Sequence, residues 1–229
     1  MLNTLQTVFS SDNIHFLLSG LWTTIQLSIV VVVLSILLGS ILGLLRNYER
    51  IFFGRLAGIY IELFRNTPLL LWMFACIFVF SGSVLDLTER GGLALWLYTS
   101  AVIAEILRGG LNSIAPGQFE AARSQGFNFI QTLWYIILPQ AYRRIIPSLL
   151  SQVITTIKDT AFLAGFGILE FFRSGQVLLG KVPTGVNATT QMFLMYGCLA
   201  LVYFLICFSL SCLVRHLQHR KGRLILPAR

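Results

Sequence analysis

The chain has 229 residues and a formal net charge of +8, and 56% of its residues are hydrophobic while only 11% are charged. This composition excludes an ordinary soluble domain and indicates a membrane protein. The basic excess does not indicate nucleic-acid binding, because the Lys and Arg residues lie at the ends of apolar runs, where membrane topology places them.

The first predicted span covers about residues 17–45. No charged residue occurs from Asn13 to Leu45, which is enough chain for one long or tilted transmembrane helix. Ser35, Gly39 and Gly43 recur every four residues, so they share a helix face that a second helix can approach closely. This spacing fits two interpretations equally, packing within the subunit and contact with a second copy.

The second predicted span covers about residues 66–85 and follows a short basic loop. We expect an interfacial helix over residues 57–65, and we expect Pro68 to start the span with Thr67 as its N-cap. After this span, residues 86–92 are predicted to form a tight, exposed turn, because they combine charged residues with two glycines.

The third predicted span covers about residues 93–111, and a polar segment follows it before the next apolar run. Pro116 is suited to open a helix there, since a first-turn residue needs no intrahelical N–H partner. Gly126 is suited to close that helix in the left-handed conformation. The predicted helix, about residues 117–126, is far too short to cross a bilayer. Its short, capped form indicates a helix that a partner protein grips.

The side chains of this short helix fit such a contact. Ala121 and Ala122 keep the helix slim enough to enter a groove on a partner. Glu120 lies near the N-terminus, where the helix dipole favours an acid, and Arg123 is placed one turn on to pair with it. Pro139 then leads the chain back into apolar sequence.

A loop motif and its flanks together resemble a known family. The motif consists of Glu120-Ala121-Ala122, Gly126, Ile136, Leu138 and Pro139. It matches the EAA loop of permease subunits of type I ATP-binding-cassette importers. The flanks, Pro116-Gly117-Gln118 and Leu138-Pro139-Gln140-Ala141, are similar to the polar amino-acid (histidine/glutamine/arginine-type) permeases. So is Arg65-Asn66-Thr67-Pro68-Leu69-Leu70, where that family usually has Gly in place of Asn66. The resemblance covers roughly residues 18–215.

The resemblance implies a single permease domain over residues 1–229 that works with several partners. These are a cytoplasmic ABC ATPase dimer, a second permease subunit, identical or homologous, and an extracytoplasmic solute-binding protein. The coupling helix contacts the ATPase through Glu120, Ala121, Ala122, Arg123, Gly126 and Pro139. The substrate is a polar or charged amino acid.

No catalytic, cofactor or metal site is expected in this chain itself. It has no Gly-rich stretch that ends in Gly-Lys-Ser/Thr, so ATP and Mg are expected in the partner ATPase. The three histidines lie at span ends and support neither a catalytic triad nor a metal site.

The fourth predicted span covers about residues 145–165 and contains Lys158 and Asp159. Charges in hydrocarbon cost several kcal/mol unless they are paired or hydrated. In the resembling permeases this part of the span lies along the translocation path at its gate. Two interpretations stay open for these charges, a path or gate role and simple pairing between helices.

We predict six residues of the substrate path or gate, namely Arg65, Thr67, Glu105, Lys158, Asp159 and Thr160. Some of these charges also belong to Glu-x-x-Arg pairs, in which each acid and base are three residues apart and can neutralise each other on a helix. The four pairs are Glu62/Arg65, Glu105/Arg108, Glu120/Arg123 and Glu170/Arg173. Two readings stay open for the first two of these pairs, a structural ion pair at a helix end and the lining of a path for a zwitterion.

A mixed segment over residues 167–188 is predicted to be a re-entrant or surface hairpin, and the fifth span covers about residues 190–214. Five spans put the two termini on opposite sides of the membrane. Twelve of the 17 Lys and Arg residues lie in the cytoplasm if the N-terminus is outside, and four lie outside. The positive-inside rule therefore favours an outside N-terminus and a cytoplasmic C-terminus. The resemblance implies that the membrane is a bacterial cell membrane.

The predicted fold is an all-α polytopic membrane protein with five transmembrane helices and one cytoplasmic coupling helix. The predicted function is the membrane-spanning subunit of an ATP-driven, binding-protein-dependent importer of polar or charged amino acids. The alternative is an ATP-independent secondary carrier or channel, which would show inverted repeats. A membrane scaffold without transport is a third reading, but it leaves Lys158 and Asp159 unexplained.

Overall fold

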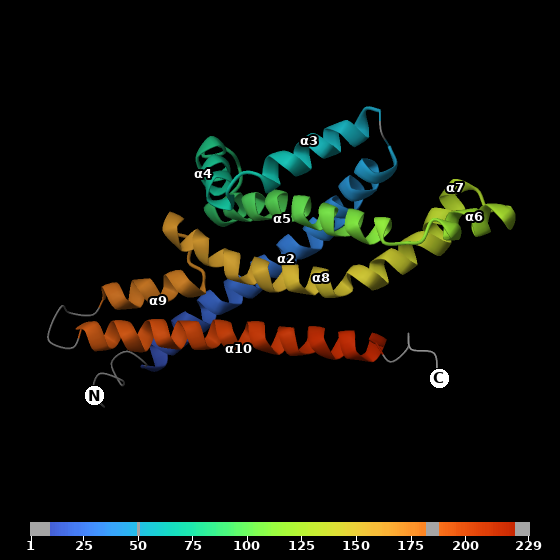
Figure 1. Ribbon diagram of the computed structural model, residues 1–229. Helices are drawn as coiled ribbons and strands as arrows, with labels where there is room; N and C mark the ends of the chain where they lie inside the picture. The colour runs from blue at the N-terminus through green and yellow to red at the C-terminus, as the bar shows by residue number, and fades with distance from the viewer. Residues whose placement is uncertain (1–9, 50, 182–187, 223–229) are drawn as a thin grey trace.

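The computed structural model describes residues 10–49, 51–181 and 188–222, and within them it contains helices and no strand, as the sequence predicts (Figure 1). Arg50, Arg223 and Arg229, which enter the topology count, lie outside the described residues. In chain order the elements are α2 (Ser11–Tyr48), α3 (Phe53–Arg65), α4 (Leu69–Val79), α5 (Leu87–Asn112), α6 (Gly117–Ser124), α7 (Phe129–Gln131), the π-helix η1 (Thr132–Ile137), α8 (Leu138–Asp159), the 3₁₀-helix η2 (Thr160–Phe166), α9 (Phe171–Gly180) and α10 (Ala188–Gly222).

The helices form an elongated bundle. Figure 1 shows α5, α8 and α10 running along its length, while α2 crosses them at an angle and contacts α5, α8 and α9. α6 and α7 lie at one end of the bundle, and α9 and the start of α10 lie at the other. A partner that approaches the α6 end therefore meets a different set of elements from one that approaches α9.

The helix lengths bear on the number of membrane spans. Within the described chain, α2, the run from Phe129 to Gly180 and α10 are each long and apolar enough to cross a membrane. The pair α3 and α4 passes that test only jointly. α5 is long enough, with 26 residues and about 39 Å of helix, but it carries the charged residues Glu105 and Arg108 and does not pass the test. The count of five spans is therefore not confirmed, and the boundaries of the spans other than the second stay predictions.

The prediction of one continuous span over residues 66–85 is wrong. α4 has only 11 residues, roughly 17 Å of helix, and its axis is bent by 104° from that of α3. The break falls at Pro68, which has no N–H to continue a helix and restricts the backbone of Thr67 before it. Pro68 itself is the N-cap of α4, so Thr67 does not cap this helix as expected.

The predicted exposed turn after α4 is also wrong, because α5 begins within it. The Asp86 carboxylate accepts the Glu89 N–H at 2.6 Å, and the Glu89 carboxylate accepts the Asp86 N–H at 2.9 Å. This capping box satisfies two donors at the start of the helix. Gly91 and Gly92 are consequently inside α5 and buried.

Small residues bring α2 and α5 into close contact. The Ser35 hydroxyl donates to the Trp96 carbonyl at 3.1 Å. A Cβ added at Gly39 would lie only 2.7 Å from the Ser100 carbonyl oxygen, and Gly43 is equally close to the backbone of α5. Any larger side chain would push the two helices apart. Of the two interpretations of this face, the structure selects packing within the subunit.

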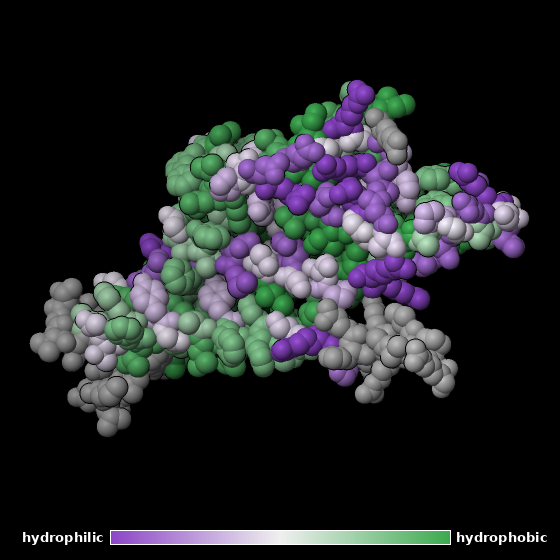
Figure 2. All heavy atoms as spheres, viewed as in Figure 1, coloured by the Kyte–Doolittle hydropathy of each residue, from purple (hydrophilic) through white to green (hydrophobic). Residues whose placement is uncertain are grey.

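Three clusters of buried apolar side chains lie along the bundle. One joins α2, α4, α5 and η2, a second joins α5, η1 and α8, and a third joins α2, α9 and α10. Many large apolar side chains on α2 and α10 nevertheless remain exposed. Such surfaces fit lipid or a neighbouring subunit rather than water. Hydrophilic residues instead gather over α3 and α5 and at the α6 end (Figure 2).

A fully buried acid, Glu170, anchors α9 to the bundle. Its carboxylate accepts the N–H groups of Phe172 at 2.9 Å and Arg173 at 2.6 Å. It also accepts the hydroxyls of Tyr203 on α10 at 3.1 Å and Thr24 on α2 at 3.4 Å. Four donors compensate the cost of burying this group. Glu170 bonds the backbone of Arg173 and not its guanidinium, so the predicted ion pair between them is wrong.

α9 occupies the segment in which the sequence predicts a hairpin. The chain leaves η2 through Gly167, whose φ of +82° suits glycine, and α9 then covers Phe171–Gly180. The rest of the predicted hairpin, including Pro183, lies outside the described residues.

Candidate functional site

The short helix predicted over about residues 117–126 is observed as α6, and its two ends are built as the sequence predicts. Pro116 precedes the helix with φ −54°, and Gly126 follows it with φ +80°. The Phe127 N–H donates back to the Ala122 carbonyl at 3.1 Å, which is the bond expected around a left-handed glycine. The prediction of a positive φ at Gly126 is therefore confirmed, and the helix ends sharply.

The side chains of α6 divide between an exposed and a buried side. Glu120, Ala121 and Arg123 are exposed, whereas Ala122 is buried against the rest of the chain. The predicted ion pair of Glu120 and Arg123 is not among the salt bridges of the described residues. Both side chains are solvated, so pairing would gain little. They stay available to a partner.

Aromatic contacts hold α6 and α7 against the C-terminal end of α2. The ring of Tyr48, at the end of α2, packs edge-on against Phe119 of α6, with centroids 6.3 Å apart. It packs in the same way against Phe129 of α7 at 5.4 Å. α6 and α7 are therefore fixed to the end of α2 as one unit, and the outer side of α6 is held in a defined orientation.

The sequence analysis missed the π-helix η1, which connects this unit to α8. Its hydrogen bonds reach back five residues, as from the Leu138 N–H to the Leu133 carbonyl. Pro139 was the residue in the sequence that could have indicated this π-helix. Proline has no N–H, so the Tyr135 carbonyl has no α-helical donor at Pro139. A change to i→i+5 bonds therefore breaks one hydrogen bond fewer here than it would in an uninterrupted α-helix. Pro139 lies in the first turn of α8, where proline is tolerated.

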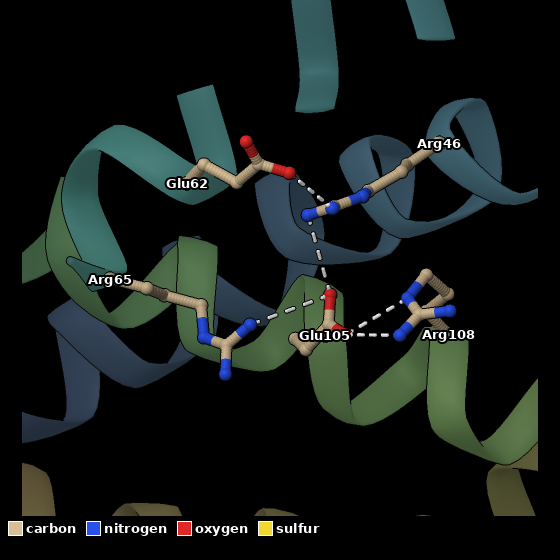
Figure 3. A network of polar contacts seen from close by, with 5 residues as sticks. All are labelled: Arg46, Glu62, Arg65, Glu105 and Arg108. Atoms are coloured by element: carbon tan, nitrogen blue, oxygen red, sulfur yellow. Dashed lines mark hydrogen bonds and ion pairs between the residues drawn. The ribbon is translucent and has the colours of Figure 1, made fainter. Parts of the chain in front are cut away.

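Five charged side chains from α2, α3 and α5 meet around Glu105 (Figure 3). Glu105 lies 2.5 Å from the Arg108 guanidinium, 3.5 Å from that of Arg46 and 3.7 Å from that of Arg65. Arg46 also bonds Glu62 at 2.7 Å. Three guanidinium groups thus face two carboxylates, and the cluster carries one excess positive charge.

Within this cluster, Glu105 and Arg108 form the only one of the four predicted Glu-x-x-Arg pairs observed in the described chain. Glu62 pairs with Arg46 instead of Arg65, and Arg65 approaches Glu105. For Glu62 and Arg65, the packing of α2, α3 and α5 brings partners from separate helices closer than the residue one turn away. The i,i+3 spacing therefore identifies the Glu105/Arg108 pair but not the other three.

Lys158, Asp159 and Thr160 lie where α8 passes into η2. The Lys158 side chain is exposed and makes no salt bridge with any described residue. Asp159 is half-buried, and the buried Thr160 hydroxyl donates to the Ile157 carbonyl at 2.8 Å. Lys158 lines a cavity of about 230 Å³ between α8, α9 and α10. The other walls of this cavity are Ala161, Phe172, Tyr196, Leu199, Ala200 and Tyr203.

The structure divides the six predicted path residues into separate groups. Arg65 and Glu105 belong to the charge cluster, while Thr67 lies in the bend between α3 and α4. The other three are those at the end of α8. Glu105 is bonded to arginines of α2, α3 and α5, so it does not serve as an interhelical partner of Lys158.

The chain is similar to known membrane components of transport systems. The model of a family described as the binding-protein-dependent transport system inner membrane component matches residues 35–223. The probable glutamine ABC transporter permease protein GlnP of Bacillus subtilis (strain 168) is 35% identical over 93% of this chain and 97% of its own length. The glutamate/aspartate import permease protein GltK of Escherichia coli O157:H7 is 33% identical over 91% of this chain and 94% of its own length.

Solved structures agree with these relatives. A crystal structure described as an amino acid ABC transporter with histidines superposes with a TM-score of 0.81 at 28% identity, over 91% of this chain and 95% of that chain. The inward-facing MetNI methionine ABC transporter gives a TM-score of 0.71 at 22% identity, over 91% and 99%, and so supports the fold alone. The resemblance carried by the EAA loop is confirmed. The chain belongs to the family of inner membrane components of binding-protein-dependent transport systems.

Proposed function

We propose that this protein is the transmembrane permease of an ATP-driven, binding-protein-dependent importer of polar or charged amino acids. The observation that carries the proposal is α6, a short helix with an exposed outer side, closed by Gly126 at one end of the bundle. Such a helix suits contact with a separate ATPase. Family membership and the amino-acid substrates of the named relatives support the same reading.

The partners follow from this role. A cytoplasmic ABC ATPase dimer binds ATP and Mg and docks on α6, and an extracytoplasmic solute-binding protein delivers the amino acid. A second permease subunit completes the pathway, because one such bundle encloses a pore poorly. ATP binding then moves α6, and the spans change between inward-open and outward-open states.

The candidate residues divide between two roles in this proposal, the ATPase contact and the substrate path. The ATPase contact is formed by Glu120, Ala121, Ala122 and Arg123, while Gly126 and Pro139 set the course of the chain after it. The substrate path takes in the charge cluster and the cavity beside Lys158. A lone cation next to a cavity suits the carboxylate of an amino acid.

Reconstitution tests the function directly. The protein, an ABC ATPase and a solute-binding protein encoded beside it are purified together and placed in liposomes. We expect uptake of a polar or charged amino acid that requires both ATP and the binding protein. Uptake that follows an ion gradient without the ATPase would instead support a secondary carrier and overturn the proposal.

Topology gives a further expected result. We propose that the N-terminus is outside and the C-terminus is in the cytoplasm. In a variant without the four native cysteines, Ser124→Cys in α6 should react with a membrane-impermeant reagent only from the cytoplasmic side. Ser83→Cys should react only from outside. Both positions are exposed. The opposite labelling pattern would place α6 away from any cytoplasmic ATPase.

A further inference from the structure

Two polar contacts connect α8 directly to the segment that joins α5 to α6. The Gln140 side-chain amide donates to the Gln118 side-chain oxygen at 3.1 Å. One turn further along α8, the Arg144 guanidinium donates to the Ser113 carbonyl, and it lies 3.2 Å from the Ser113 hydroxyl. Residues 140 and 144 share one face of α8 because they are four apart.

The two contacts hold both ends of a short linker. Ser113 is the C-cap of α5, and Gln118 lies in the first turn of α6. Between α5 and α8 the backbones are also close, since a Cβ added at Gly110 would lie 3.4 Å from the Ala141 carbonyl oxygen. A displacement of α6 and of the linker before it is therefore transmitted to α8 through these side-chain contacts.

The covalent route from α6 to α8 is longer and less stiff. It passes through Gly126, α7 and the π-helix η1, a rare i→i+5 register that occurs mostly as short turns inside α-helices. A segment of this kind can absorb movement by shifting its register. The contacts of Gln140 with Gln118 and of Arg144 with Ser113 give a second, direct route, and the Gln140 amide also donates to the Ile136 carbonyl of η1 at 2.9 Å. α8 in turn ends at Lys158 and Asp159, two of the predicted path residues.

We propose that Gln140 and Arg144 are positioning residues that transmit the movement of α6 to α8, through Gln118 and Ser113. This inference rests on the proposed function, in which the ATPase moves α6. Neither residue needs to touch ATP, the ATPase or the substrate. Their contribution is that α6 and α8 move together, so that each ATP hydrolysed produces one change at the path.

The exposure of these contacts separates this role from a structural one. Gln118 and Arg144 are exposed and Gln140 is half-buried, so each group can bond water when its partner is removed. Removing a contact should therefore change stability little. A loss of transport without loss of the complex would consequently reflect transmission rather than folding.

The test compares Gln140→Ala, Gln118→Ala and the double variant in the complete reconstituted complex. We expect normal copurification of the ATPase, an unchanged melting temperature, and transport per ATP lowered by roughly 5-fold or more, the lower end of coupling between distant sites. The double variant should be no worse than Gln140→Ala alone, because Gln118→Ala removes a contact that Gln140→Ala has already removed. Arg144→Ala should behave similarly.

Replacement of the contact provides the matched control. Gln118→Glu combined with Gln140→Lys puts an ion pair where the hydrogen bond was, and we expect it to restore transport per ATP. Unchanged transport per ATP in all variants would overturn the inference, as would a fall in melting temperature that parallels every loss of activity. The wild-type complex reports separately on the proposed function: if it shows no ATP-driven uptake, that function fails, whatever the variants do.

Discussion

Replacing Gly126 by valine is expected to leave the protein in the membrane but to abolish substrate-stimulated ATP hydrolysis in the complex. Gly126 has φ +80°, and a Cβ built on it meets no atom within 4 Å. The effect is therefore conformational and not steric. The left-handed region costs an L-residue about 1–2 kcal/mol and a β-branched residue more, so the chain leaves α6 in another direction. The ATPase would then meet a misplaced helix.

A graded series at this position separates conformation from side-chain size. Gly126→Asn should keep most of the stimulation, because asparagine tolerates the left-handed region, and Gly126→Ala should be intermediate. Gly117→Ala, at the start of α6, is the control, since a Cβ there also meets open space but its φ is not positive. Normal stimulation by Gly126→Val would show that this glycine does not aim the coupling helix.

Lys158→Met is expected to assemble with its ATPase at near-normal yield and melting temperature but to transport on the order of 10- to 100-fold more slowly. That range corresponds to about 1.5–3 kcal/mol, typical of a hydrogen bond to a charged group. The lysine makes no salt bridge with any described residue, so its removal breaks no direct ion pair there. What is lost is the cation beside the cavity.

Lys181→Met is the matched control for this substitution. It removes the same group at the end of α9, where the ammonium lies 5.5 Å from the Phe16 ring, outside that cavity. Uptake and ATP hydrolysis are measured for both variants, with and without the binding protein. If Lys158→Met fails to assemble and transport returns when Asp159 is also neutralised, the lysine serves pairing between helices and the path role must be abandoned.

The helix α6 could be located from the sequence because residues within and next to it decide where it begins and ends. Pro116 tolerates the first turn and Gly126 tolerates a positive φ, and both effects act within a few residues of the chain. The position of α6 and the two residues that bound it were therefore predictable from the sequence. The π-helix after it was not, since Pro139 only weakens one α-helical bond and does not dictate the register that replaces it.

The charge cluster shows where prediction from the sequence ends. The i,i+3 rule correctly paired Glu105 with Arg108, which share one helix. It failed for Glu62, whose partner Arg46 is 16 positions away on another helix. Nothing local to Glu62 specifies how α3 lies against α2.

The sequence by itself determined that the chain is helical and enters a membrane, that α6 lies between apolar runs, and that Gly126 is left-handed. These properties depend on composition and on backbone freedom, which each residue carries with it. Only the tertiary structure decided that Ser35, Gly39 and Gly43 face α5, and that α4 turns 104° from α3. The reason is physical, because contacts between helices are fixed by the packing of surfaces that are far apart in the chain. A periodic pattern shows which residues share a helix face but not which helix packs against that face.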